Sequence, residues 1–127
     1  MNSRHDESVL ARQWNNYRSV HHSRKNLLIH LLMVPVFMAG TVSVGAGVVL
    51  AILGKAGAFG AAGAIAGGLF AMILSIGLQG VGHKAEERAP EPFAGPKDVV
   101  LRIFAEQWIT FPRYVLSGQF ARALSGS

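Results

Sequence analysis

The chain has 127 residues, 50% of them apolar and 15% charged, with a net charge of +5 and no cysteine. Soluble domains carry about 25% charged residues, so the shortage favours a lipid environment, and the length suits one domain. The missing cysteine excludes disulfides and thiolate metal sites, and the modest, dispersed positive charge suits a membrane surface better than nucleic acid. We therefore expect a single all-α membrane domain over residues 1–127 and no nucleic-acid partner.

Residues 1–26 are polar and lack the early apolar stretch of a signal peptide, so we expect a cytoplasmic segment here. A helix is predicted from about Ser8, because apolar and aromatic residues recur there at roughly helical spacing. Trp14 and Tyr17 belong to this pattern and are residue types typical of the lipid headgroup boundary. The pattern predicts an amphipathic N-terminal helix.

Two uncharged runs follow, at residues 27–54 and 56–82, with Lys55 between them. A spanning helix needs about 20 apolar residues, so each run is long enough, even with Pro35 in the first. We predict two transmembrane helices joined by a short turn at residues 54–57, which is a membrane hairpin. The alternative is a pair of buried helices in a soluble bundle.

Charge predicts the orientation of this hairpin. The turn carries only Lys55, whereas all other Lys and Arg residues lie in the two flanks. The positive-inside rule then places both termini in the cytoplasm and the turn outside.

Small residues recur along the second run at intervals that let helix backbones approach closely. One set is Gly60, Ala64 and Gly68, and another is Gly63 and Gly67. Two interpretations stay open, which are packing of the two helices within one chain and a homodimer formed through the second helix.

The C-terminal third is less apolar. Three prolines within residues 83–97 predict a cytoplasmic loop. Residues 98–118 resume an apolar pattern interrupted by Arg102, Glu106 and Arg113, which predicts a helix lying in the membrane interface rather than spanning it. We expect Asp98 to cap this helix, Pro112 to end or kink it, and residues 119–127 to form a weakly ordered tail.

Three histidines, His21, His30 and His83, stand where a hairpin would gather them at the cytoplasmic face. Imidazole is the commonest biological metal ligand, so the cluster predicts a metal site. His21 and His30 would point about 180° apart on an unbroken helix, so sharing a metal requires a break between them. Residues 23–25 are the expected break, with Ser23 or Asn26 capping the following helix.

In the second segment, Gln79, His83 and either Glu86 or Glu87 lie on one helical face. Such a carboxylate can bind the metal or orient the imidazole. Asn26 and Gln79 have a simpler interpretation as hydrogen bonders in helix packing, and a lone interfacial histidine is often merely solvated.

The string from His21 to His30, His-His-Ser-Arg-Lys-Asn-Leu-Leu-Ile-His, is followed by Val34-Pro35. Together with Gln-Gly-Val-Gly-His at residues 79–83, then an acidic residue and Pro90, it resembles the membrane 2-hydroxy fatty acid dioxygenases related to the yeast enzyme of phytosphingosine breakdown. Residues 103–116 are similar to the tail of small bacterial relatives. The chain departs from the larger relatives in having one clear hairpin.

The resemblance implies an iron(II)-dependent enzyme, with Fe²⁺ as cofactor, that uses O₂ to shorten a 2-hydroxy fatty acid by one carbon. It implies metal ligands at His21, His30 and His83, with His22 a further candidate. Its acidic position falls on Glu86 or Glu87, as a ligand or a residue behind the ligands. We expect orienting roles for Asn26 and Gln79, and steering of the anionic substrate by cations at the same face, which are Arg24, Lys25, Lys84 and Arg88.

Two other classes of function fit the same residues. A haem-bearing electron-transfer hairpin would use His30 and His83 as its two axial ligands. A structural or holin-like small membrane protein would tolerate the loss of every histidine, and the gathering of polar residues at one face argues against it.

Overall fold

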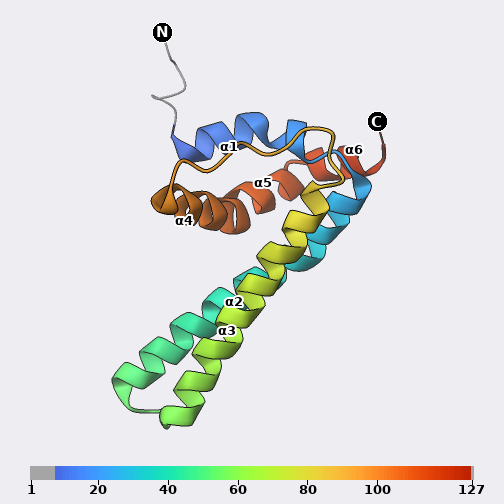
Figure 1. The fold of residues 1–127 in the computed structure, drawn as a ribbon. Helices are drawn as coiled ribbons and strands as arrows, with labels where there is room; N and C mark the ends of the chain where they lie inside the picture. The colour runs from blue at the N-terminus through green and yellow to red at the C-terminus, as the bar shows by residue number, and fades with distance from the viewer. Residues whose placement is uncertain (1–7, 127) are drawn as a thin grey trace. The chain divides into compact units, whose positions relative to one another are not determined.

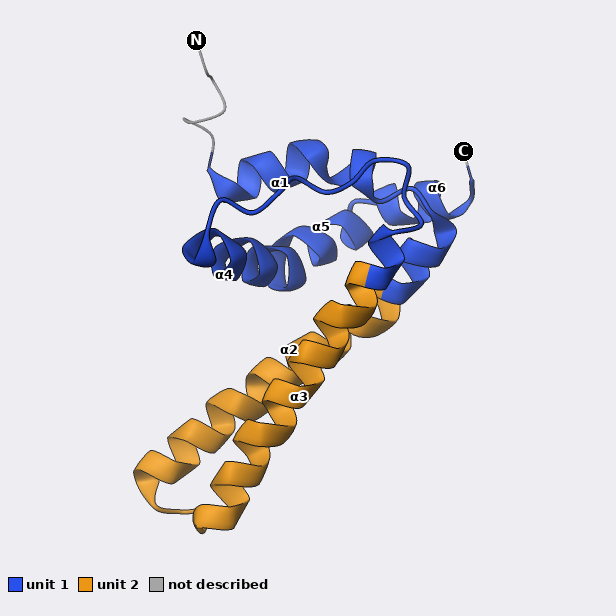
Figure 2. Ribbon diagram, in the orientation of Figure 1, with its two compact units in different colours: residues 1–29, 81–127 blue, residues 30–80 orange. Residues whose placement is uncertain are grey.

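The computed structural model describes residues 8–126, and this part of the chain is helical and contains no strand. The prediction of an all-α protein is confirmed. The chain divides into two compact units (Figure 2). Unit 1 combines the residues up to Ile29 with those from Val81 onward, and unit 2 comprises residues 30–80.

Two long helices, α2 (Arg24–Leu53) and α3 (Ala58–His83), form the expected antiparallel hairpin (Figure 1). Each is long and apolar enough to cross a membrane. Gly54 ends α2 with a φ of 65°, which glycine adopts without steric cost. The amide of Gly54 bonds to the carbonyl of Ala51 and that of Lys55 to the carbonyl of Leu50, which is a Schellman motif. The turn therefore lies where the sequence predicts it.

Within unit 2, glycines let the two helix backbones touch. A Cβ added to Gly40 would lie 2.7 Å from the carbonyl oxygen of Gly68, and one added to Gly68 would lie 2.6 Å from that of Gly40. Seven residues along α2, a Cβ on Gly47 would lie 3.0 Å from the carbonyl oxygen of Ala61. Contacts repeating at this interval are typical of gently supercoiled helix pairs. Gly68 therefore serves packing within the chain.

Gly63 and Gly67 lie on another face of α3, where an added Cβ would meet no atom within 4 Å. A homodimer through this face stays a prediction. Large apolar side chains are also exposed on the hairpin, including Phe59 at 95% and Ile73 at 72%. In the interior of a soluble bundle these side chains would be buried, so their exposure favours lipid as the surrounding medium.

Unit 1 begins with α1 (Val9–Tyr17), and the Ser8 hydroxyl caps it by accepting a hydrogen bond from the amide of Ala11. The predicted amphipathic helix is thus present. A short 3-10 turn, η2 (Arg18–Val20), follows α1. The indole of Trp14 packs under the guanidinium of Arg113, whose carbon lies 3.8 Å from the ring centroid, so α1 is tied to the C-terminal helices.

The C-terminal region differs from the single helix expected over residues 98–118. It contains α4 (Pro96–Ala105), a π-helical segment η3 (Glu106–Thr110), α5 (Phe111–Leu116) and α6 (Gln119–Leu124). Pro112 is the second residue of α5, and helical backbone geometry runs into it directly from η3, so it does not end the helical path. The break comes instead at Gly118, whose φ is 84°.

Two expectations about this region are wrong. Residues 119–124 form α6, because Phe120 and Ala123 are buried in unit 1, and Phe120 packs edge-on against Phe111. Asp98 is not the N-cap of α4, which begins two residues earlier after Gly95. The Asp98 carboxylate instead reaches back and accepts a hydrogen bond of 2.9 Å from the amide of Ala94.

Candidate metal centre

The helix break that the histidine spacing requires is present. The chain leaves η2 at Val20, and α2 begins at Arg24. His21 occupies the break with φ −136° and ψ 64°, outside helical values. The Ser23 hydroxyl caps α2 weakly, lying 3.5 Å from the amide of Asn26. The direction of the His21 side chain is therefore not set by the helical periodicity of α2.

Glu86 holds this break in place from the other end of the hairpin. Its carboxylate accepts hydrogen bonds from the backbone amides of His22 and Ser23, each with a shortest distance of 2.7 Å, and from Asn26 Nδ2 at 2.8 Å. Partial burial raises the pKa of Glu86, but these three donors outweigh it and hold that pKa below its ordinary value. Glu86 is thus an ionised cap for the start of α2, with its oxygens engaged by these donors.

Gly82 makes room for this arrangement. A Cβ at position 82 would lie 2.5 Å from Oδ1 of Asn26 and 3.3 Å from its Cα. The side chain of Asn26 is fully buried, and its amide also reaches the carbonyl of Val20 at 3.4 Å. Asn26 therefore acts in this structure as a buried hydrogen bonder that connects the break, Glu86 and α3.

His21 is oriented as a metal ligand would be. It is 2% exposed, and its Nδ1 lies 2.9 Å from the carbonyl oxygen of Tyr17. A carbonyl only accepts, so Nδ1 carries the proton in this contact, and Nε2 is the atom that presents a lone pair when the ring binds a metal. Imidazoles that bind metals usually donate their second N–H to such a carbonyl or carboxylate. The Tyr17 ring also stacks on the imidazole, with centroids 3.7 Å apart.

The carboxylate beside this lone pair belongs to Glu106, the first residue of η3. Its Oε2 lies 3.3 Å from Nε2 of His21. Two acceptors at this distance repel each other unless a proton or a cation lies between them. Burial, and then the Glu106 carboxylate, raises the pKa of Tyr17 well above its ordinary value, so its hydroxyl stays protonated.

His83 completes a group of three in unit 1. Its ring meets that of His21 edge-on, with centroids 4.7 Å apart. One ligand atom from each of His21, His83 and Glu106 lies within 4.8 Å of the others. Ligand atoms bound to a metal at about 2.1 Å lie about 3 to 4 Å apart, so little closure is needed around an ion. Two imidazoles and one carboxylate form a donor set that fits a divalent transition metal.

The third predicted histidine, His30, is fully buried and is the first residue of unit 2. It lies one helical turn after Asn26 on the same face of α2. In the same unit, Gln79 donates a hydrogen bond of 2.9 Å to the Ser75 hydroxyl, which donates to the carbonyl of Met33 at 2.6 Å. Gln79 thus takes part in packing α3 on α2, the simpler of its two interpretations.

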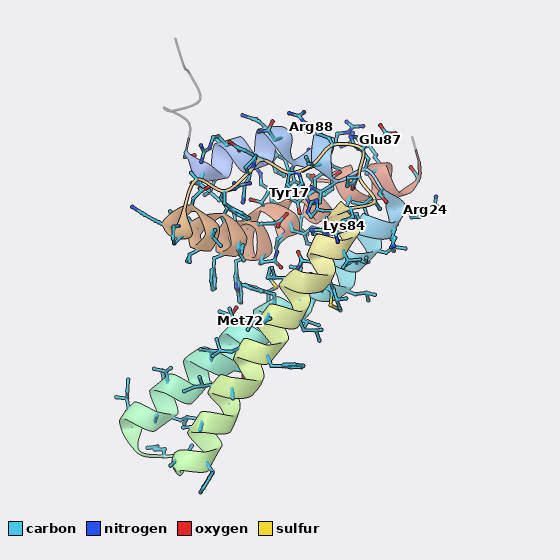
Figure 3. The ribbon with its side chains drawn as sticks, in the orientation of Figure 1. Tyr17, Arg24, Met72, Lys84, Glu87 and Arg88 are labelled. Atoms are coloured by element: carbon cyan, nitrogen blue, oxygen red, sulfur yellow. The ribbon has the colours of Figure 1, made fainter. Side chains whose placement is uncertain are left out.

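The other predicted residues lie at the surface of unit 1. His22 is exposed and contributes its backbone amide to Glu86. Glu87 is exposed, as are the nearby cations Lys84 and Arg88 (Figure 3). The guanidinium of Arg24 is bound to the carbonyl of Leu124 through Nε and Nη2, at 3.2 and 3.0 Å, so it caps α6.

Glu106 is the residue that sequence reasoning missed. It counted only as an interruption in the apolar pattern of residues 98–118. The available signal was a charge interrupting an apolar helical pattern, and Arg102 and Arg113 interrupt the same pattern, so the signal does not single out Glu106. Comparison of the chain with protein-family models, with curated proteins and with solved structures found no match.

Proposed function

We propose that the protein is an iron(II)-dependent membrane dioxygenase that shortens 2-hydroxy fatty acids by one carbon at the cytoplasmic face. The observation that carries the proposal is the group formed by His21, His83 and Glu106, with ligand atoms within 4.8 Å of one another. Two histidines and one carboxylate are the ligand set of non-haem iron(II) oxygenases, which keep open positions for O₂ and substrate. The resemblance of the two histidine motifs to 2-hydroxy fatty acid dioxygenases supplies the substrate class.

The resemblance also implies His30 as a ligand; it is buried and can bind a metal, and this role stays a prediction. When bound, iron(II) supplies the coordination positions at which a chelating 2-hydroxy acid and O₂ meet. His21 presents Nε2 to the ion because its Nδ1–H is held by the Tyr17 carbonyl. Glu106 supplies the negative charge that balances the ion, while Glu86 keeps the break that aims His21.

The substrate's carboxylate is anionic, and exposed cations border the start of α2 and the end of α3. Lys25, Lys84 and Arg88 are exposed and suited to steer it, whereas Arg24 is engaged with α6. The alkyl tail belongs in lipid. We place α2 and α3 across the membrane, with both termini in the cytoplasm of a bacterial-type inner membrane, as the flanking charges favour.

The helices α4 and α5 belong at the membrane interface in this proposal. Their path has a buried polar and aromatic side, with Gln107, Thr110 and Tyr114. Its exposed large apolar side chains are Val100, Leu101, Trp108, Ile109 and Leu116. An amphipathic path of this kind, with an exposed tryptophan, is typical of segments that lie at the headgroup boundary.

The test is oxygen uptake by the detergent-purified protein, loaded anaerobically with Fe(II), on adding 2-hydroxypalmitate. We expect uptake that needs both iron and the 2-hydroxyl, with palmitate as the substrate control and a fatty acid one carbon shorter as product. His30→Ala and His83→Ala should lose iron together with activity, whereas His22→Ala should keep both. Iron-loaded protein that takes up no oxygen would contradict the proposed reaction, and a haem absorption band near 400 nm would favour the electron-transfer alternative.

A further inference from the structure

Helix α1 presents two side chains toward the candidate metal centre, Gln13 and Tyr17. They are four residues apart and therefore lie on the same helical face. Figure 3 shows Tyr17 directed from α1 into unit 1, and it is 3% exposed. Neither side chain is a metal ligand in the proposed site, yet each contacts an element that carries one.

Tyr17 fixes His21 in two ways. Its ring stacks on the imidazole at 3.7 Å with the two planes only 9° apart, which sets the plane of the ring. Its backbone carbonyl accepts the Nδ1–H of the same imidazole at 2.9 Å, which sets the tautomer. Replacing Tyr17 by a non-aromatic residue removes the stacking and leaves the carbonyl, so the two effects can be separated.

Gln13 fixes the segment that carries Glu106. Its Nε2 donates to the carbonyl of Arg102 at 2.6 Å, and its Oε1 accepts from the Thr110 hydroxyl at 2.6 Å. Arg102 lies one turn before Glu106, and Thr110 is the last residue of η3. One side-chain amide therefore ties the turn before the π-helical segment, and the last residue of that segment, to α1.

The π-helical segment matters because it changes where Glu106 points. The amide of Phe111 bonds to the carbonyl of Glu106, five residues back, so the segment holds one residue more per turn than an α-helix. Such widened turns are less favourable than α-helix, occur mostly as single turns, and are frequent at functional sites.

We propose that the Gln13–Tyr17 face of α1 positions two ligands of the metal site, Tyr17 acting on His21 and Gln13 acting on Glu106. The inference rests on the proposed metal site and is independent of the substrate. It makes Gln13 and Tyr17 positioning residues, which affect the metal only through the ligands they hold.

The experiment is a spectroscopic titration of the full chain in detergent micelles with Co(II), whose affinity is read without any turnover. Gln13→Ala should weaken Co(II) binding by about 10- to 100-fold, as expected for groups that orient ligands. In a Glu106→Ala background the same substitution should have no further effect. Tyr17→Leu should bind Co(II) more weakly than Tyr17→Phe, which keeps the stacking ring but lacks the hydroxyl beside Glu106, and this difference should vanish in a His21→Ala background.

Asn16→Ala, on the exposed face of α1, is the matched control and should leave the affinity unchanged. If Gln13→Ala does not fold, Gln13→Met keeps the length of the side chain and removes only its hydrogen bonds. Equal losses of affinity in the presence and absence of Glu106, or no loss at all, would overturn the positioning role. A wild-type protein that binds no Co(II) would overturn the metal site itself, whereas one that binds Co(II) but takes up no oxygen with Fe(II) would overturn only the dioxygenase.

Discussion

Glu86 and Ser23 lie at opposite ends of the hairpin sequence, yet Oε1 of Glu86 accepts a hydrogen bond of 2.7 Å from the amide of Ser23. Together with the bond from His22, this gives α2 a charged cap supplied by the residues that follow α3. The contact joins the residues after α3 to the start of α2, next to the helix break in which His21 lies. Three predictions about stability follow from the cap and from the packing of the hairpin.

Glu86→Gln should destabilise the protein by about 1–2 kcal/mol, because it removes the charge from a cap that satisfies two backbone amides and Asn26. The measurement is the apparent free energy of unfolding in mixed detergent micelles. Glu87→Gln is the matched control, since Glu87 is exposed and next in sequence. Equal stability of the two variants would show that the cap contributes nothing.

The same cap predicts a dependence on pH. The pKa of Glu86 is lower in the folded protein than its ordinary value, because its hydrogen-bond donors outweigh burial. Its contribution is therefore fully present above the unfolded pKa of about 4.3, and it is lost as the pH falls through the folded pKa. The stability difference between wild type and Glu86→Gln should be constant from about pH 7 to about pH 5 and should shrink in more acid solution. A difference that stays constant in acid would contradict the shifted pKa.

Two adjacent glycines of α3 should respond in opposite ways to alanine. Gly68→Ala should destabilise the hairpin by about 1–3 kcal/mol, because its Cβ would lie 2.6 Å from the carbonyl oxygen of Gly40. Gly67→Ala meets open space and removes a helix-disfavouring glycine, so it should be neutral or stabilising by up to about 1 kcal/mol. Unfolding of both variants in mixed micelles checks the packing register, and destabilisation by Gly67→Ala instead would show that its face is in contact.

Local patterns explain why the hairpin was predictable. The uncharged runs, Gly54 at the turn and the helical spacing around Trp14 are each visible within a few residues. The break near Ser23 was also predictable, because two histidines nine residues apart cannot share a helical face. These features depend on neighbours in sequence or on the antiparallel pairing of two long helices.

Long-range contacts explain what was missed. Glu106 approaches His21 from the far end of the chain, and no local pattern distinguishes it from the other charges that interrupt its helix. Gln13 contacts the π-helical segment and the turn before it from 89 to 97 residues away in sequence, and α6 buries Phe120. Glu86 lay on the expected face beside His83, but its role follows from two backbone amides of the break, which sequence spacing does not reveal.

Glu106→Gln should separate charge from shape at the candidate centre. The amide keeps the size of the side chain but removes the negative charge that lies 3.3 Å from Nε2 of His21. Binding of Co(II) should weaken by at least about 10-fold, because a neutral amide is a poorer metal ligand than a carboxylate. The measurement is a Co(II) titration, with Glu87→Gln as the control that changes net charge equally.

Anaerobic Fe(II) binding to the wild type and single-site variants tests the central claim most directly. The account predicts one iron per chain, with affinity falling at least about 100-fold in His21→Ala and His83→Ala and unchanged in the exposed-site variant His22→Ala. Equal affinity in all four proteins, or no binding by the wild type, would contradict a metal centre built on His21 and His83.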